Sequence, residues 1–216
     1  MQDFFELLKQ QRWDDHRYYH HRRINQSLHL VSAICFVAAY ALLFVDPATA
    51  ALLAWGVSMT TRQAGHFFFE PKGYDHVNHA THQHKEDIKI GYNLQRKVVL
   101  MALWALAPLL LWAAPSLFGL IEPAIGLPAY LHDVGLLWLA LGAVGVLFRA
   151  MQLLVQQDGR TALAWVVKIL TDPFHDISLY WKSPYHLVRG RLMDSTDHSP
   201  NPTSPTDPSN PTSGPR

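Results

Sequence analysis

The sequence of 216 residues has very little cysteine and comparatively little charge. Cys35 is its one cysteine, which excludes an internal disulfide framework and a metal site built from several cysteines. Charged residues make up 16%, against about 25% in an average soluble protein. The formal net charge of +1 gives no electrostatic reason to expect a nucleic-acid partner. The length favours a single domain.

Charge is missing above all from long apolar stretches. Residues 25–45, 98–121 and 134–148 contain no Asp, Glu, Lys or Arg, and residues 48–69 contain only Arg62. An apolar helix of about 20 residues crosses a bilayer, and lipid leaves no other partner for the backbone polar groups. The predicted fold class is therefore all-α, a polytopic membrane helix bundle with about four transmembrane helices. Asp46-Pro47 predicts a turn that makes the first two spans a hairpin.

Basic residues predict the orientation of this bundle in the bilayer. Neither the turn near Asp46 nor the connection over residues 117–133 contains Lys or Arg. The positive-inside rule then places both termini and the middle loop in the cytoplasm, in a bacterial inner membrane or the endoplasmic reticulum. The predicted parts are a cytoplasmic N-terminal arm (1–23), a membrane domain (24–155) with a cytoplasmic His-rich loop (71–97), an interfacial or cytoplasmic helical region (156–194) and a disordered tail (195–216).

Most of the 13 histidines fall at the cytoplasmic side of this predicted topology. Neutral imidazole is a common ligand of iron, zinc and copper, so the placement predicts a metal site at the cytoplasmic membrane surface. His29 and His66 are the strongest candidates, because a polar side chain in or at the end of an apolar helix needs a partner. Further candidates are His76, His84, His175 and His186.

The spacing of the other candidate ligands sets the conditions under which each of them can bind the same metal ion. His20 lies nine positions before His29 and would point to the opposite face of a continuous helix, so it is a co-ligand only if it precedes the helix. His79 and His82 are three apart and form a one-turn pair if their loop contains a short helix. The alternative for these loop histidines is a solvated polar segment.

Two pairs of polar residues have helical i, i+4 spacing. His66 and Glu70 share a face if the helix continues, and so do Asn25 and His29. A carboxylate such as Glu70 can complete a metal's coordination or hold a ligating imidazole in its correct tautomer.

Two motifs resemble the integral-membrane 2-hydroxy fatty acid dioxygenases of fatty acid alpha-oxidation. In "HHRRINQSLH", His20, Asn25 and His29 are similar to that family's His-x4-Asn-x3-His. In "GHFFFE", Gly65, His66 and Glu70 are similar to its Gly-His-x-x-Phe-Glu. The resemblance covers residues 18–70, and the region after Met151 has no counterpart that we can place.

The resemblance implies an Fe(II)-dependent oxidoreductase of the bilayer. Such an enzyme uses molecular oxygen to shorten a long-chain 2-hydroxy fatty acid by one carbon. It further implies metal ligands among His20, His29, His66, His79 and His82, with Glu70 and Asn25 as catalytic residues. Arg22 or Arg23 would pair with the substrate carboxylate. The alternative, that both arginines set the topology and contact anionic lipid, is the interpretation that the sequence favours for them.

Other classes of protein remain open. A di-iron fatty acid hydroxylase or desaturase uses several histidine boxes, and "HVNHATHQH" resembles one superficially. A non-enzymatic protein that binds or transports zinc or nickel is a further alternative. A transporter places ionisable ligands near the bilayer midplane, however, and the middles of the predicted spans are apolar. The sequence does not predict an oligomeric state.

Overall fold

The computed structural model describes residues 3–70, 73–75, 78–90 and 94–194, without the side chains of residues 86 and 94. His76 and the predicted disordered tail (195–216) lie outside these ranges. The described residues are helical apart from their connections and two isolated bridges, which confirms the all-α class. The elements are α1 (Phe4–Tyr19), α2 (Arg23–Leu42), α3 (Pro47–Leu53), η1 (Ala54–Met59), α4 (Thr60–Ala64), η2 (Gly65–Phe69), α5 (His82–Asp87), α6 (Leu94–Ala113), η3 (Leu117–Gly119), α7 (Leu127–Gln156), α8 (Gly159–Tyr180) and α9 (Ser183–Val188).

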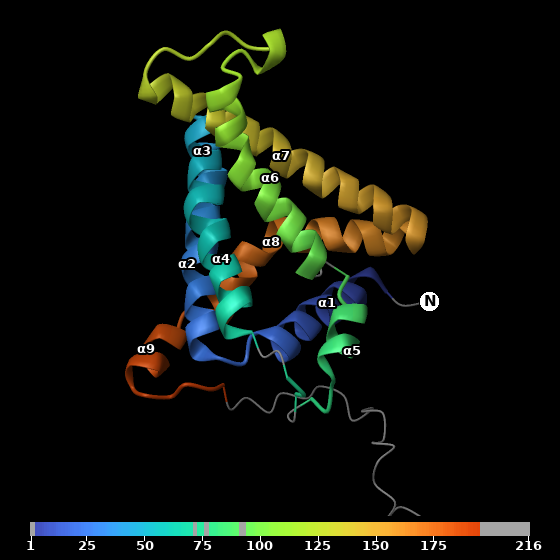
Figure 1. Cartoon of the computed structure of the whole chain (residues 1–216). Helices are drawn as coiled ribbons and strands as arrows, with labels where there is room; N and C mark the ends of the chain where they lie inside the picture. The colour runs from blue at the N-terminus through green and yellow to red at the C-terminus, as the bar shows by residue number, and fades with distance from the viewer. Residues whose placement is uncertain (1–2, 71–72, 76–77, 91–93, 195–216) are drawn as a thin grey trace, which may run out of the picture.

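Helix α2 and the run from α3 to η2 form the predicted hairpin, and they lie side by side in Figure 1. Helix α7 packs along α3, and α6 packs on α7. Helix α8 returns along α2, and α1 packs against α8 near the same end of the molecule as α9. The fold thus brings α1, the start of α2, the end of the η2 run and α8 together at one end (Figure 1).

Three of the described helices are long and apolar enough to cross a membrane: α2, residues 95–113 of α6, and α7. This indicates an integral membrane protein. The predicted span over residues 48–69 consists of four consecutive short elements, two of them π-helical. The count of four spans therefore stays a prediction. Helix α7 begins at Leu127, earlier than the predicted start at residue 134, and α8 lies in the predicted interfacial region.

Local sequence explains how the hairpin turns and packs. The Asp46 side chain accepts a hydrogen bond from the Thr49 backbone N–H, and Pro47 occupies the first turn, where a missing N–H costs nothing. Helix α7 approaches the hairpin closely at Gly135. A Cβ there would lie 2.4 Å from the carbonyl oxygen of Ala48. Small residues of this kind let helix backbones pack closely where lipid supplies no hydrophobic driving force.

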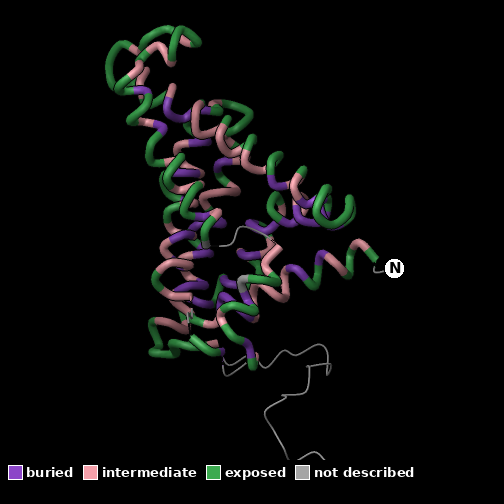
Figure 2. The backbone as a smooth tube through the Cα atoms, turned by 45° about the vertical axis from the view of Figure 1, so that its right-hand side comes forward, coloured by how far each residue is buried: buried purple, intermediate pink, exposed green. Residues whose placement is uncertain are grey.

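Burial is concentrated where α1, α2 and α8 meet (Figure 2). Much of what is buried there is polar. Asn25, Gln26, His29 and Ser32 of α2 are each 0% exposed. A buried polar group is costly unless it is partnered, so this end of the bundle is where function is expected.

Candidate metal centre

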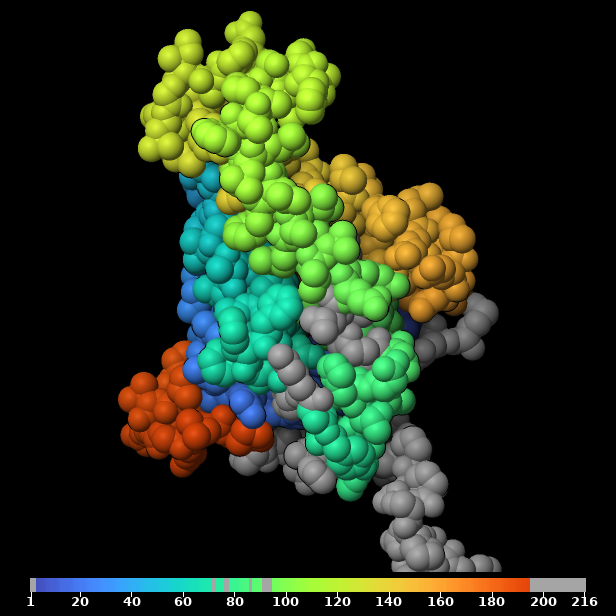
Figure 3. Space-filling model, in the orientation of Figure 1, coloured from blue at the N-terminus to red at the C-terminus, as the bar shows by residue number. Residues whose placement is uncertain are grey.

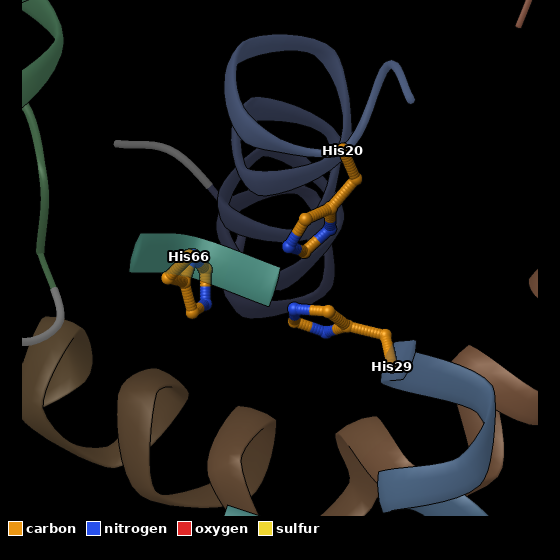
Figure 4. A group of neighbouring side chains, drawn as sticks. All are labelled: His20, His29 and His66. Carbon is orange, nitrogen blue, oxygen red and sulfur yellow. The ribbon is translucent and has the colours of Figure 1, made fainter. Parts of the chain in front are cut away.

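Three imidazoles from three separate segments converge at this end of the bundle. His20 follows α1, His29 lies in α2 and His66 lies in η2. One nitrogen from each ring lies within 4.8 Å of the others. The ring centroids are 4.0 Å apart for His20 and His29, and 5.0 Å apart for His29 and His66. Figure 4 shows the nitrogen atoms of the rings directed toward one another. A single metal ion can be held by such a set.

A reversal of the chain brings His20 to His29. Helix α1 ends at Tyr19 and α2 begins at Arg23, so His20 belongs to neither helix. The condition that spacing set for His20 as a co-ligand is therefore met. The first turn of α2 holds this reversal in place: Asn25 Nδ2 donates to the carbonyl of Tyr19 at 2.7 Å, and Gln26 Nε2 donates to that of His20 at 2.8 Å. The structure thus gives Asn25 a contact that positions the ligand segment.

Gly65 permits η2 to approach α2. A Cβ at Gly65 would lie 2.2 Å from Oδ1 of Asn25 and 3.4 Å from Cδ2 of His29. The first distance requires the Asn25 side chain or one of the two helices to move. The glycine of the "GHFFFE" motif is therefore explained by close packing against the "NQSLH" segment, which seats His66 beside His29.

An oxygen atom lies near the Nδ1 atom of each imidazole, and for His66 and His20 it is within hydrogen-bond distance. His66 Nδ1 lies 2.7 Å from Oε2 of Glu70, as the i, i+4 spacing predicted. His20 Nδ1 lies 2.9 Å from the hydroxyl of Tyr180 in α8. His29 Nδ1 lies 3.8 Å from Oδ2 of Asp176, which is longer than a hydrogen bond but close enough for attraction. Partners of this kind fix the ring orientation and tautomer of histidine ligands.

The contact with Glu70 leaves Nε2 of His66 as the nitrogen available to a metal. A carboxylate accepts a hydrogen bond, so Nδ1 of His66 carries the proton and its Nε2 keeps a free lone pair. If His20 binds through Nε2, its Nδ1–H donates to Tyr180. The Tyr180 hydroxyl then donates to Nδ1 of His16, which lies 3.1 Å away. Glu70 is placed for the second of its two predicted roles, that of orienting an imidazole, and this role stays a prediction.

The unsatisfied atoms fit a metal ion. Nε2 of His20 and both ring nitrogens of His29 are buried without a hydrogen-bond partner. Buried polar atoms are normally paired, and an unpaired cluster in one place calls for an ion or another ligand. Burial, followed by the charges of His29 and Arg62, also holds the pKa of His20 well below its ordinary value of 6.5. The ring is therefore neutral and able to bind a metal.

Helix α8 supplies a buried charged network behind the cluster. Arg62 of α4 lies 3.2 Å from Asp176. Burial alone would raise the pKa of Asp176, but the Arg62 guanidinium, together with His29 and Lys168, outweighs burial and lowers the pKa to about 2. Lys168 contacts Asp15 of α1 at 2.5 Å and Asp172 at 2.6 Å. Burial favours the neutral amine, yet these two carboxylates raise the pKa of Lys168 above 10.5.

Sequence reasoning did not single out these α8 residues. A signal was present, because Lys168, Asp172, Asp176 and Tyr180 recur every four residues and are all buried. Such spacing places four polar side chains on one helix face. A polar stripe within an otherwise apolar segment indicates a face that meets polar partners.

The loop histidines His79 and His82 are not part of the group formed by the three converging imidazoles. A short helix, α5, does begin at His82. The loop is instead tied to the N-terminal arm. Asn78 Nδ2 donates to the carbonyl of Arg17 at 2.8 Å, and the Tyr19 hydroxyl donates to that of Lys85. A role for His79 and His82 as ligands stays a prediction.

The two arginines proposed for substrate binding lie at the start of α2. Arg22 is exposed and its backbone forms an isolated bridge with Met193. Arg23 is paired with Asp194 at 2.7 Å and donates to Gln26 at 2.8 Å. These contacts attach the segment after α9 to α2, which is a structural use of Arg23.

Comparison with known proteins yields no relative for this chain. No family model, curated protein or solved structure matches it. The geometry of the site therefore has to carry the functional argument.

Proposed function

We propose that this protein is an Fe(II)-dependent membrane dioxygenase that shortens long-chain 2-hydroxy fatty acids by one carbon. The observation that carries the proposal is the convergence of His20, His29 and His66 at one end of an apolar helix bundle. The motifs that hold these histidines are those that resemble the alpha-oxidation dioxygenases. The resemblance supports iron as the metal, since imidazole also suits zinc, copper and nickel.

The protein's own residues would hold and orient the metal. His20, His29 and His66 would bind it through Nε2, with Tyr180, Asp176 and Glu70 behind them. Three protein ligands leave further coordination positions open, and an iron ion bound there would supply the capacity to activate oxygen. Burial of His29 and His20 excludes bulk water from the inner side of the cluster.

The proposed reaction balances with one molecule of oxygen. The bond between C1 and C2 of the 2-hydroxy acid breaks, and C1 leaves as carbon dioxide. C2 is oxidised from an alcohol to the carboxyl carbon of the shortened acid. This oxidation releases four electrons, which one O2 accepts, and one molecule of water forms overall.

The end of the bundle that holds the three histidines would face the cytoplasm. The connections without Lys or Arg, between α2 and α3 and between α6 and α7, both lie at the end opposite α1 and α9 (Figure 1). The positive-inside rule assigns such connections to the outer side. A fatty acid in the inner leaflet would then present its polar head at the level of the three histidines.

The ligand set favours one metal ion over two. In the described part of the chain, one group of three potential ligands is found, formed by the three histidines. A di-iron hydroxylase needs more ligands than three. Metal analysis of anaerobically purified protein tests this: one iron per chain supports the dioxygenase, two support a di-iron enzyme, and zinc or nickel supports metal binding or transport.

Activity provides the second test. Protein loaded with Fe(II) should convert 2-hydroxyhexadecanoate and O2 to pentadecanoate. His29→Ala and His66→Ala should each lose both iron and product, because each removes one of three ligands. His132→Ala is the matched control, since His132 is 57% exposed in α7 at the other end of the molecule. Wild-type protein that retains iron but yields no shortened acid from any chain length would refute the proposed reaction.

A further inference from the structure

A cavity lies between the end of α6 and the start of α7, at the end of the molecule opposite the three histidines (Figure 1). Its volume is about 180 Å³. Sites for drug-sized molecules have ~300 Å³ or more, so this cavity suits a smaller chemical group. It is lined by Leu111, Trp112, Pro115, Ala124, Tyr130 and Asp133.

Asp133 supplies the one charged side chain among these lining residues. Its Oδ1 lies 3.5 Å from Nδ1 of His132, whose side chain is 57% exposed. An exposed pair of this kind contributes little, so the carboxylate can exchange it for a bound cation. Residues 98–148 contain Glu122 and Asp133 but no Lys or Arg. The charge of this end of the molecule therefore favours a positively charged ligand.

The end of α6 adds to the negative potential in the cavity. Leu111 and Trp112 belong to the last turn of α6, and Pro115 follows the helix. The C-terminus of a helix carries a partial negative charge, because the dipoles of its peptide groups are aligned. This charge and the carboxylate of Asp133 act on the same cavity.

Two aromatic rings, those of Trp112 and Tyr130, indicate the class of cation. The Tyr130 hydroxyl donates to the carbonyl of Pro108 at 2.7 Å, which holds the Tyr130 ring against α6. Trp112 is 77% exposed, so the cavity can be reached from outside. Aromatic faces attract organic ammonium groups, whereas a calcium ion needs six or more oxygen ligands. One carboxylate and two rings therefore suit an ammonium group better than a metal ion.

The surface around the cavity is apolar. Phe118, Leu120 and Ile125 of the connection between α6 and α7 are 81%, 78% and 94% exposed. The space-filling view shows this connection projecting beyond α3 at that end of the molecule (Figure 3). In an integral membrane protein, such side chains are stable in contact with lipid, and Trp and Tyr gather at the level of the headgroups. A lipid headgroup is therefore the source of ammonium groups nearest to the cavity.

We propose that this cavity binds the ammonium headgroup of a membrane lipid. Asp133 is the counter-ion and accepts a charge-assisted hydrogen bond from the ammonium, while Trp112 and Tyr130 form the aromatic walls. The acyl chains lie along the exposed apolar surface of the protein. Because the site and the three histidines lie at opposite ends of the molecule, lipid binding does not depend on the proposed function.

The test compares two lipids with identical acyl chains. Native mass spectrometry measures the affinity of full-length, delipidated protein for phosphatidylethanolamine and for phosphatidylglycerol, which has no ammonium group. The ethanolamine lipid should bind about tenfold more tightly, the usual effect of a hydrogen bond to a charged group, and Asp133→Asn should abolish this preference. Trp112→Leu should weaken binding of the ethanolamine lipid by about twofold to fivefold, the effect of an exposed cation–π contact.

Glu122→Gln is the matched control, because Glu122 is exposed in the same connection but lies outside the lining of the cavity. It should keep the preference for the ethanolamine lipid. Equal loss of the preference in Asp133→Asn and Glu122→Gln would overturn the site, since it would assign the effect to the general negative charge of this end. If Asp133→Asn does not fold, equal affinity of wild type for the two lipids would overturn the proposal.

Two further measurements define the ligand and separate it from the metal centre. Free ethanolamine should bind much more weakly than the lipid, and an equal affinity would replace the lipid by a soluble amine. His29→Ala, which should lose its metal, should keep the lipid preference of wild type. Loss of the preference in His29→Ala would contradict a site that is independent of the histidines.

Discussion

The hydroxyl of Tyr180 lies 2.9 Å from Nδ1 of His20, although 160 positions of the sequence separate the two residues. The same hydroxyl contacts Nδ1 of His16 at 3.1 Å. Tyr180 therefore links α8 both to the end of α1 and to a proposed metal ligand. The last third of the chain thus shapes a site whose ligands all lie in the first third.

Tyr180→Phe should weaken metal binding without abolishing it. The substitution removes only the hydroxyl, so the ring packing stays and Nδ1 of His20 loses its partner. Loss of such a partner costs about tenfold to a hundredfold in metal affinity. Chelator competition measures the change, and Tyr185→Phe is the control because Tyr185 is 54% exposed in α9. Equal affinity in the two variants would show that the hydroxyl does not orient His20.

Gly65→Ala should destabilise the protein and misplace His66. Its Cβ would lie 2.2 Å from Asn25 Oδ1, and overpacking of this kind costs about 1–3 kcal/mol. Gly56→Ala is the matched control in the same helical run, because nothing lies within 4 Å of a Cβ there. Its higher helix propensity should make it neutral or more stable by up to about 1 kcal/mol.

A second substitution can confirm the cause of the Gly65→Ala effect. Asn25→Ala removes the oxygen with which the new Cβ collides. Thermal unfolding of both single variants and the double variant should show a favourable interaction between the two substitutions. Strictly additive effects would mean that the collision with Asn25 is not what limits this position.

Lys168→Met should loosen α1 from α8. Lys168 pairs with both Asp15 and Asp172, and its removal leaves these two carboxylates without their shared cation. Loss of one member of a buried ion pair costs about 3–5 kcal/mol, and we expect the lower end because Asp15 is partly exposed. Denaturant unfolding measures the change against Lys182→Met, an exposed lysine next to α9. A destabilisation no larger than in this control would contradict the assigned role.

The attachment of the histidine loop should depend on pH through Asp75. Burial favours its protonated form, but hydrogen bonds from Asn78 and the charges of His21 and Lys85 hold the pKa of Asp75 below 3.8. A carboxyl group whose pKa is lowered by folding stabilises the folded loop at pH values above its ordinary pKa. This contribution is lost as the pH falls through the pKa of the folded state. The charged form of Asp75 should therefore stabilise the loop at neutral pH.

Hydrogen exchange of residues 78–90, compared between wild type and the variant Asp75→Asn, tests this role of the Asp75 charge. The variant keeps an oxygen that can accept from Asn78 but has no charge. Its loop should exchange faster than wild type at pH 6, and the difference should narrow below pH 3.8. A difference that does not change with pH would show that the charge of Asp75 is not involved.

Local patterns predicted the features that depend on neighbouring residues. The Asp46-Pro47 turn and the contact between His66 and Glu70 both follow from short-range spacing. The division of residues 47–69 into α and π segments did not follow, because a π-helical turn reflects tertiary packing and is not visible as a change of apolar period. The number of the loop histidines is visible in the sequence but the direction of their side chains is not, so a ligand role for His79 and His82 stays a prediction.

By itself the sequence determined the helical class, the apolar surfaces and the candidate pair His29 and His66. These follow from the absence of charge over long runs and from polar side chains placed within them. Only the tertiary structure decided that His20 joins them, that Gly65 seats η2 against Asn25, and that Tyr180 and Asp176 stand behind the rings. Such contacts depend on the reversal of the chain after α1 and on the packing of α8 along α2. No periodicity within one segment encodes the distance between two helices.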